Sequence, residues 1–401
     1  MSRPKLPWRY GPGAGQGLML GTFAVAMSVF ATWFASESLI ATSGEVASTG
    51  LAGARAEPFA YALGLFAIGL FFAARLRAGA FITIADFLKD RFGSSTEGLA
   101  AVVIALSATT WSAAQLYAFA VLIAQAVGVD FTAALIGATL LVMTYTLFGG
   151  LAGDVVTDIV QGLIILAAIT ILLVLLVDAA GGPQALWQAA PATRLSFAVP
   201  GESWVDRAEL WLIPIIGTMV SQEALARSLA ARSPAVARRG AMIGAMVYLI
   251  AGLIPVALGL FGPVLAPRLG VALGEGEAFL PALAAALLPP WLYVVVTGAL
   301  ISAILSSVDS ALLAVSAVAT ESGYRRLRPE ASPLALLRAA RAATVGAAAL
   351  AAWLAAQGES LRDLVLDASA IAAVLAVPIV MGLARIGTGT RAGLAAIAVQ
   401  V

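Results

Sequence analysis

Long apolar runs constrain this chain more than any other feature of its sequence. A helix needs about 20 predominantly apolar residues to cross the hydrocarbon core of a bilayer. Ten runs answer to this description, at about 15–40, 59–74, 97–127, 131–148, 155–177, 208–226, 239–262, 289–318, 338–356 and 364–384. None of them alternates with period two as membrane strands do. The sequence therefore predicts an all-α integral membrane protein with ten transmembrane helices.

The distribution of basic residues predicts an orientation in the membrane. With ten crossings and the N-terminus inside, 18 of the 23 Lys and Arg residues fall on one side. Cytoplasmic loops carry such an excess, so we expect both termini in the cytoplasm and the chain in the plasma (inner) membrane. The net charge is only +1, which gives no basis for nucleic-acid binding.

The chain contains no His and no Cys. This removes thiol nucleophiles, haem ligation and the usual zinc sites. No nucleophile–base motif or phosphate-binding loop is present either. We therefore expect no enzymatic activity, no cofactor and no obligatory protein partner, but a small-molecule solute and the lipid bilayer.

Ten helices divide into two halves of five, and an odd number per half inverts the second half in the membrane. We expect a single transporter domain over 1–401, with repeats at 15–178 and 207–386. The first helix of each half is the place for a break. The first has small and polar residues in its middle, and the sixth contains Pro214 and Gly217, which a simple kink would also explain. Residues 391–401 are interpreted as the start of a further helix that is cut short.

A polar cluster interrupts the apolar run "ISAILSSVDSALLAVSA" at 301–317. Ser306, Asp309 and Ser310 share one helical face through their i, i+3 and i+4 spacing. Close helix packing would explain the serines alone. A carboxylate with no basic residue within a turn, here and at Asp158, instead favours an oxygen-rich cation site.

Other polar and aromatic residues in the spans have simpler readings. Glu223 has Arg227 at i+4, which predicts an ion pair near the cytoplasmic end. Trp33, Tyr61 and Trp111 would face a cationic ligand if they converge, although lone membrane aromatics are usually packing or interface residues.

Three segments carry a family resemblance, namely "GAFITIADFLKDRFG" (79–93), "GGLAGDVVTDIVQGLI" (149–164) and "SAILSSVDSALLAVSA" (302–317). They resemble the signature regions of the sodium:solute symporter family, in the same order. The resemblance implies the five-plus-five inverted-repeat fold of the leucine transporter, with helices 1 and 6 broken. Within the family the chain looks most like the high-affinity choline transporter branch.

The resemblance also implies two cation sites. The main sodium site would use the carbonyls of Ala31, Phe34 and Ala303 with the hydroxyls of Ser306 and Ser307. A second cation site would fall on Asp158, Ser306, Asp309 and Ser310, where Asp309 replaces a hydroxyl of the better-known versions.

The choline branch surrounds its substrate with aromatic residues, three of which match Trp33, Tyr61 and Trp111. A fourth, a Trp, is replaced by Ser221, which opens the implied pocket. Gln222 and Glu37 would add polar contacts.

The expected function is a sodium-coupled symporter that imports a small organic solute by alternating access. An amine or another cationic or zwitterionic compound is the expected class. Two alternatives remain open at this point: proton coupling through Asp158 or Asp309, and a transporter-like membrane sensor without net transport.

Overall fold

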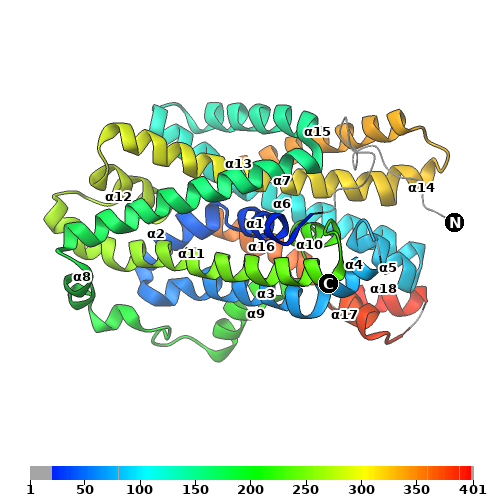
Figure 1. Cartoon of the computed structure of the whole chain (residues 1–401), viewed down its shortest axis with the longest axis horizontal. Coiled ribbons are helices and arrows are strands. Elements are labelled where there is room, and N and C mark those ends of the chain that lie inside the picture. The colour runs from blue at the N-terminus through cyan, green and yellow to red at the C-terminus, as the bar shows by residue number, and fades with distance from the viewer. Residues whose placement is uncertain (1–19, 80, 359, 388, 399–401) are drawn as a thin grey trace.

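The computed structural model describes residues 20–79, 81–358, 360–387 and 389–398. These residues form helices throughout, and the one β-type contact among them is a bridge between Leu20 and Ala231. Figure 1 shows the helices as a long bundle with most axes roughly along its length. The prediction of an all-helical protein is confirmed for the described part of the chain.

Seven helical stretches are long and apolar enough to cross a membrane. They are Glu37–Ala78, Ser94–Ala124, Gly153–Ala180, Pro234–Leu269, Pro290–Leu327, Pro333–Gln357 and Leu361–Ala384. Three shorter apolar helices accompany them, at Thr22–Trp33, Phe131–Thr144 and Gly276–Leu287. The membrane-protein class is thus supported, while the count of ten crossings stays a prediction.

The first apolar run is broken, as the sequence predicts. It comprises α1 (Thr22–Trp33), the π-helix η2 (Glu37–Ala41) and α2 (Thr42–Thr49). Phe34 leaves the helical region with φ −83° and ψ 71°. The amide of Ala35 donates to the carbonyl of Trp33 at 3.0 Å, instead of to that of Ala31 four residues back. The break therefore frees backbone groups in the middle of the bundle.

The sixth run is also broken, but at a different residue from those predicted. It comprises α9 (Trp204–Val220) and α10 (Gln222–Leu229), separated by Ser221 in an extended conformation with φ −65° and ψ 134°. Both Ser221 groups, N–H and Oγ–H, donate to the carbonyl of Thr218 at 3.3 and 3.2 Å. A serine that bonds to the preceding turn offers the backbone an alternative to continuing the helix.

Pro214 and Gly217, the predicted breakpoints, lie inside α9. Gly217 instead allows close packing: a Cβ there would stand 2.7 Å from the backbone oxygen of Ser369 in α16 (Leu361–Ala373). The prediction of the break position was wrong because the glycine serves a contact with another helix and not a change of direction.

The remaining elements follow in chain order. They are η3 (Gly50–Ala54), η4 (Arg55–Ala60), α3 (Tyr61–Ala67), η5 (Ile68–Phe72), α4 (Ala73–Ala78), α5 (Ile84–Phe92), α6 (Ser94–Val127), α7 (Phe131–Ala180), α8 (Pro183–Ala189), η6 (Ala192–Leu195), α11 (Pro234–Leu269), η7 (Gly276–Ala278), α12 (Phe279–Leu287), α13 (Pro290–Val318), η8 (Ala319–Tyr324), α14 (Arg325–Leu327), α15 (Pro333–Gln357), α17 (Ala376–Ala384) and α18 (Thr390–Ala398).

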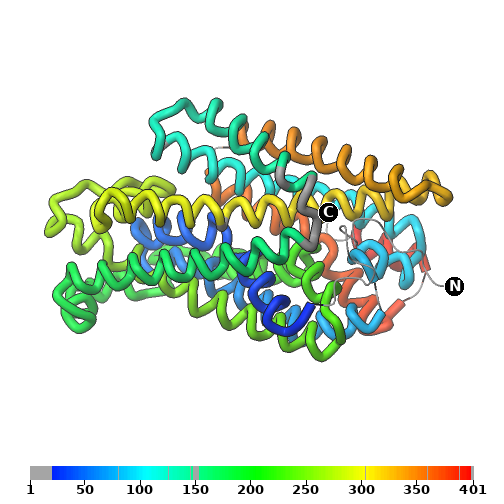
Figure 2. The backbone as a smooth tube through the Cα atoms, turned by 45° about the horizontal axis from the view of Figure 1, so that its top comes forward, coloured from blue at the N-terminus to red at the C-terminus, as the bar shows by residue number. Residues whose placement is uncertain are grey.

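The predicted spans at 131–148 and 155–177 both lie in the element α7, which comprises Phe131–Ala180. Figure 2 shows its first and last parts, in teal and green, as rods that run in opposite directions. The proposed further helix at 391–401 corresponds to α18, and residues 399–401 lie outside the described part of the chain.

Two groups of helices position the site. The broken first helix packs against α7, α10, α11 and α13, and α16 packs between α6 and α9. Figure 1 places α4, α5 and α14 at one end of the bundle and α8 and α12 at the other. The end with α4, α5 and α14 carries many of the basic residues that we assign to the cytoplasm.

Candidate functional site

The break in the first helix lies directly against α13. The Oγ of Ser307 donates to the carbonyl oxygen of Thr32 at 3.1 Å. Ala31 and Phe34, two predicted sodium ligands, flank Thr32 and are buried. The side chains of Ser306 and Ser307 are also buried. Ala303 belongs to α13, but its surroundings lie outside what the structure describes.

Carbonyls and hydroxyls are the hard oxygen ligands that an alkali cation takes. The break, the freed Ala31 carbonyl and the two serines thus bring suitable groups together, and these residues could hold a sodium ion.

Asp158 of α7 is the centre of a neighbouring polar cluster. Its Oδ1 accepts a hydrogen bond from Ser306, and its Oδ2 accepts from Ser28 and, at 3.4 Å, from Thr32. Asp158 is fully buried. A carboxylate at this depth is stable only with several donors around it, and α1 and α13 supply them.

Arg227 of α10 completes this cluster. Its Nη2 lies 2.5 Å from Asp154 Oδ2 and 3.3 Å from Asp158 Oδ2. The same nitrogen donates to Ser310 Oγ at 2.5 Å, and Nε donates to Ser28 Oγ at 3.2 Å. Only 1% of the Arg227 side chain is exposed. The cluster therefore joins α1, α7, α10 and α13 through one buried cation and two carboxylates.

The predicted ion pair between Glu223 and Arg227 is wrong. Arg227 turns toward α7, where two carboxylates are available instead of one, and Glu223 lines a different cavity. Asp154 lies inside α7 and is an ion-pair partner of Arg227. Neither contact follows from spacing along one helix, because the partners come from different helices.

Asp309 differs from the other predicted ligands of the second site in its hydrogen bonding. Asp158, Ser306 and Ser310 share the Arg227 cluster, whereas the buried Oδ1 of Asp309 has no hydrogen-bond partner among the described residues. Within the same residues no group of three or more acidic side chains is arranged to hold a metal ion.

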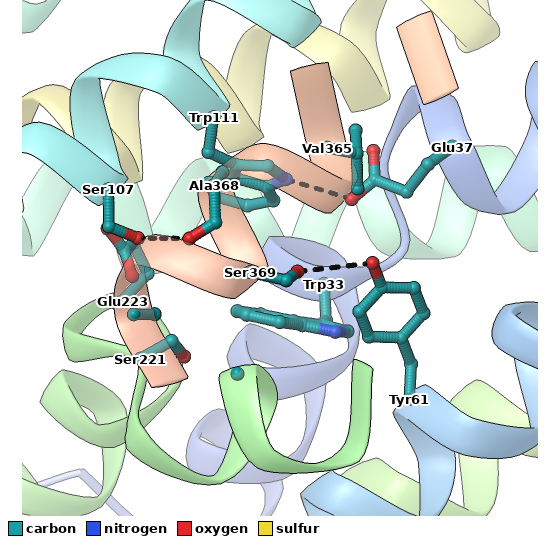
Figure 3. A pocket seen from close by; sticks show the side chains of 12 residues that line it. Trp33, Glu37, Tyr61, Ser107, Trp111, Ser221, Glu223, Val365, Ala368 and Ser369 are labelled. Carbon is teal, nitrogen blue, oxygen red and sulfur yellow. Dashed lines mark hydrogen bonds between the residues drawn. The ribbon is translucent and has the colours of Figure 1, made fainter. Parts of the chain in front are cut away.

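The three predicted aromatic residues, Trp33, Tyr61 and Trp111, converge in one cavity, which Figure 3 shows. The rings of Trp33 and Trp111 stack at 5.3 Å with an interplanar angle of 26°. Tyr61 meets Trp33 edge-on at 6.2 Å, and its hydroxyl lies 3.3 Å from Ser369 Oγ. Three helices thus place aromatic faces around one space, and α16 closes it from another side.

Glu37 fixes one wall of this aromatic cavity. Its Oε1 accepts from Trp111 Nε1 at 2.9 Å, and its Oε2 accepts from Gln115 Nε2 at 2.6 Å. The Oε1 of Gln115 in turn accepts from the N–H and Oγ of Ser36, at 3.1 and 2.7 Å. These bonds tie the break in the first helix to α6 and hold the Trp111 ring in place.

The lining of this cavity is acidic. Two carboxylates, Glu37 and Glu223, line the cavity, and its lining contains no Lys or Arg among the described residues. The indole Nε1 of Trp33 is buried without a hydrogen-bond partner among them, so it could donate to a ligand. Ser221 also lines the cavity, at the position where the resemblance implies a Trp in the choline branch.

Gln222 does not reach this cavity. Its Oε1 accepts from the backbone N–H of Ile84 at 2.8 Å and so ties α10 to the start of α5.

A larger cavity adjoins the aromatic one and shares Glu37, Tyr61 and Val365 with it. It is lined further by Glu45, Glu57, Glu277, Asp363 and Arg362, so carboxylates outnumber basic groups. This space forms an acidic approach to the aromatic residues.

Sequence reasoning missed Arg227, Asp154 and Ser28 as members of one cluster, and Glu223 and Ser369 as cavity residues. A usable signal existed for Arg227, because a permanently charged side chain so close to a predicted helix break requires buried partners.

Comparison with known proteins agrees with these observations. The profile of the sodium:solute symporter family matches residues 14–385. The osmoregulated proline transporter OpuE of Bacillus subtilis is 28% identical over 349 residues, which cover 84% of this chain and 70% of that protein. The high-affinity choline transporter 1 of Drosophila melanogaster is 32% identical over 145 residues, which cover 36% of this chain and only 24% of that protein.

The fold agrees with a solved structure of a Na⁺-coupled sialic acid symporter in a substrate-bound, outward-open state. The TM-score is 0.75 at 19% identity, and the match covers 99% of this chain and 92% of that one. The resemblance noted in the three sequence segments is confirmed by a match along most of the chain. This chain belongs to the sodium:solute symporter family.

Proposed function

We propose that this protein is a sodium-coupled symporter that imports a small organic cation or zwitterion, such as an amine, by alternating access. The observation that carries the proposal is the break in the first helix beside α13, where Ser307 lies 3.1 Å from the Thr32 carbonyl. Membership of a family of sodium:solute symporters supports the coupling ion.

A sodium ion at this position would couple the sodium site to the aromatic cavity, because the first helix contributes residues to both. The first helix supplies Ala31 and Phe34 to the sodium site and Trp33 and Glu37 to the aromatic cavity. An ion between the first helix and α13 would favour the arrangement of the break in which Trp33 faces the solute. Sodium and solute then stabilise the same conformation, which is the thermodynamic content of symport.

The solute class follows from the cavity. An organic cation can contact the aromatic rings of Trp33, Tyr61 and Trp111 that line the cavity, while Glu37 and Glu223 supply negative charge. The free Nε1–H of Trp33 suits a ligand that also carries a hydrogen-bond acceptor. Glu37, Ser221, Trp33, Tyr61 and Trp111 are the residues we propose for solute binding.

The topology that we propose is ten crossings in two inverted repeats, 15–178 and 207–386, in the plasma (inner) membrane with both termini cytoplasmic. The two breaks, at Phe34 and Ser221, support this division because each lies in the first helix of its repeat. The proposed activity is transport of a small solute, without enzymatic turnover.

The test is uptake into proteoliposomes by the double variant Ser306→Ala and Ser307→Ala. Radiolabelled methylammonium and tetramethylammonium are the first solutes to measure, with and without an inward sodium gradient. We expect the double variant to lose sodium-stimulated uptake. A matched control is Ser316→Ala, which removes a buried hydroxyl from the same helix that donates to the Ala340 carbonyl at 3.1 Å. Wild-type sodium dependence in the double variant would refute the sodium site.

One observation favours a second candidate, proton coupling through Asp309, since its buried Oδ1 has no partner among the described residues. Uptake driven by a pH gradient in sodium-free buffer, and abolished in Asp309→Asn, would establish it. Binding without any accumulation would instead indicate a membrane sensor.

A further inference from the structure

A further cavity lies outside both proposed sites, at the end of the bundle that we assign to the cytoplasm. It forms where α13 continues through η8 and α14, and the chain then turns back into α15. Figure 1 shows α14 at the same end as α4 and α5. The residues that line this cavity belong to η8, to the turn before α15 and to the first turns of α15.

Three side chains of the cavity can donate hydrogen bonds to an anion. The Arg338 guanidinium and the Tyr324 hydroxyl have no hydrogen-bond or ion-pair partner in the part of the chain that the structure describes. Ser332 Oγ accepts from the N–H of Ala335 at 3.3 Å, which leaves its own hydrogen to donate. Among the described residues no Asp or Glu lines the cavity. These groups therefore suit a ligand with several negatively charged oxygens.

The remaining lining is largely apolar and lies on α15, where it includes Leu334, Ala339 and Ala342. This lining continues into a surface of the same helix on which Val345 is 41% and Trp353 is 59% exposed. The helix is long and apolar enough to cross a membrane. A hydrocarbon chain can therefore lie along α15 while a polar group at its end reaches Arg338.

The position of Arg338 along α15 matches the level of lipid headgroups. Trp353 lies 15 residues further along the helix, which is about 22 Å at a rise of about 1.5 Å per residue. An exposed Trp is typical of the membrane interface, and the hydrocarbon core is about 30 Å thick. With Trp353 near one interface, the long Arg338 side chain extends toward the other, where lipid phosphates lie. An Arg in a spanning helix needs such a counter-charge.

The surroundings of the cavity are basic overall. Residues 319–342 contain five Arg and two Glu. Arg325 pairs with Glu321 at 3.2 Å, and Arg326 donates to the Ser94 carbonyl at 3.0 Å. A headgroup with a net negative charge is attracted to this region, whereas the amine of a zwitterionic headgroup is repelled.

We propose that this cavity binds an anionic phospholipid of the cytoplasmic leaflet. Its phosphate contacts Arg338, Tyr324 and Ser332, and one acyl chain lies along α15. The proposal depends neither on the coupling ion nor on the solute.

The experiment is native mass spectrometry of the delipidated protein in detergent micelles, titrated with dioleoylphosphatidylglycerol or with dioleoylphosphatidylcholine. The two lipids have the same acyl chains, so a difference in affinity reports the headgroup. We expect the first phosphatidylglycerol to bind wild type about fivefold more tightly, or more, than the first phosphatidylcholine. A large excess of inorganic phosphate should not displace it, because the acyl chain contributes to binding.

Four variants locate the site. Arg338→Gln should weaken the binding of the first phosphatidylglycerol by about fivefold or more, while Arg338→Lys should keep most of the affinity. Arg328→Gln is the matched control, because it removes an equal exposed charge from the same turn and Arg328 does not line the cavity. Ala342→Trp fills the apolar part of the cavity and should weaken phosphatidylglycerol binding without a change of charge.

Equal affinity of wild type for the two lipids would overturn the proposal, and this result does not depend on whether any variant folds. An equal loss of affinity in Arg328→Gln and Arg338→Gln would overturn it too, since the attraction would then belong to the basic turn as a whole. Displacement of the lipid by inorganic phosphate would mean that the cavity takes free phosphate, and not a lipid. A preference for phosphatidylglycerol that Arg338→Gln and Ala342→Trp lose and Arg328→Gln keeps would support the proposal.

Discussion

The ion pair between Arg227 and Asp154 allows a quantitative test of the buried cluster. At the observed N···O distances of 2.5 and 3.3 Å, the Coulomb attractions of Arg227 to Asp154 and Asp158 are about 7 and 5 kcal/mol at an effective dielectric constant of about 20. Desolvation of the three charges offsets most of this gross attraction. The cluster as a whole carries one excess negative charge.

Arg227→Gln leaves two carboxylates buried without a counter-charge. Removal of one partner from a buried pair costs about 3–5 kcal/mol, and we expect the free energy of unfolding to fall by this amount. Asp154→Asn should cost less, because Arg227 and Asp158 then balance each other. The double variant has the same excess charge as wild type, so we expect a coupling energy of about 2–3 kcal/mol between the two substitutions.

The assay is reversible unfolding in mixed micelles with increasing SDS, in sodium-free buffer, for wild type, both single variants and the double variant. Two results would refute the reasoning. One is a double variant whose loss of stability equals the sum of the two single losses to within about 0.5 kcal/mol, and the other is an Arg227→Gln protein whose free energy of unfolding lies within about 1 kcal/mol of wild type.

Three further predictions concern the cavity and the loop before α9. Trp33→Ala removes the ring stacked on Trp111 at 5.3 Å and should weaken the binding of tetramethylammonium, measured by calorimetry, by about tenfold or more. Unchanged affinity would exclude Trp33 from the solute site. Gly217→Ala places a Cβ 2.7 Å from a backbone oxygen of α16 and should lower both the thermal stability of the protein and its affinity for solute. Wild-type stability together with wild-type affinity would contradict the tight packing of α9 on α16. The hydrogen bond from Arg55 lowers the pKa of Glu202, so this contact stabilises the loop above the ordinary carboxyl pKa and is lost as pH falls through the lowered value. The hydrogen-exchange protection factors of residues 196–206, which are corrected for the intrinsic pH dependence of amide exchange, should fall in acid in wild type and change little with pH in Glu202→Gln.

The amino-acid sequence by itself determines the class of this protein. Apolar runs of membrane-spanning length leave helices as the way to satisfy the backbone in lipid, and the structure has helices at these runs. The break in the first helix was also readable, because small and polar residues such as Ser36 and Ser38 weaken a helix through local effects. The family followed from three segments that keep their order along the chain.

Only the tertiary structure decided which polar groups meet. The i+4 rule assigned Arg227 to Glu223, yet Arg227 bonds to Asp154 on another helix, since two buried carboxylates attract a guanidinium more strongly than one at a neighbouring turn. The second break likewise falls at Ser221 and not at Gly217, which is needed as a close contact with α16. Helical periodicity reports which residues share a face, but it carries no information about what a different helix brings to that face.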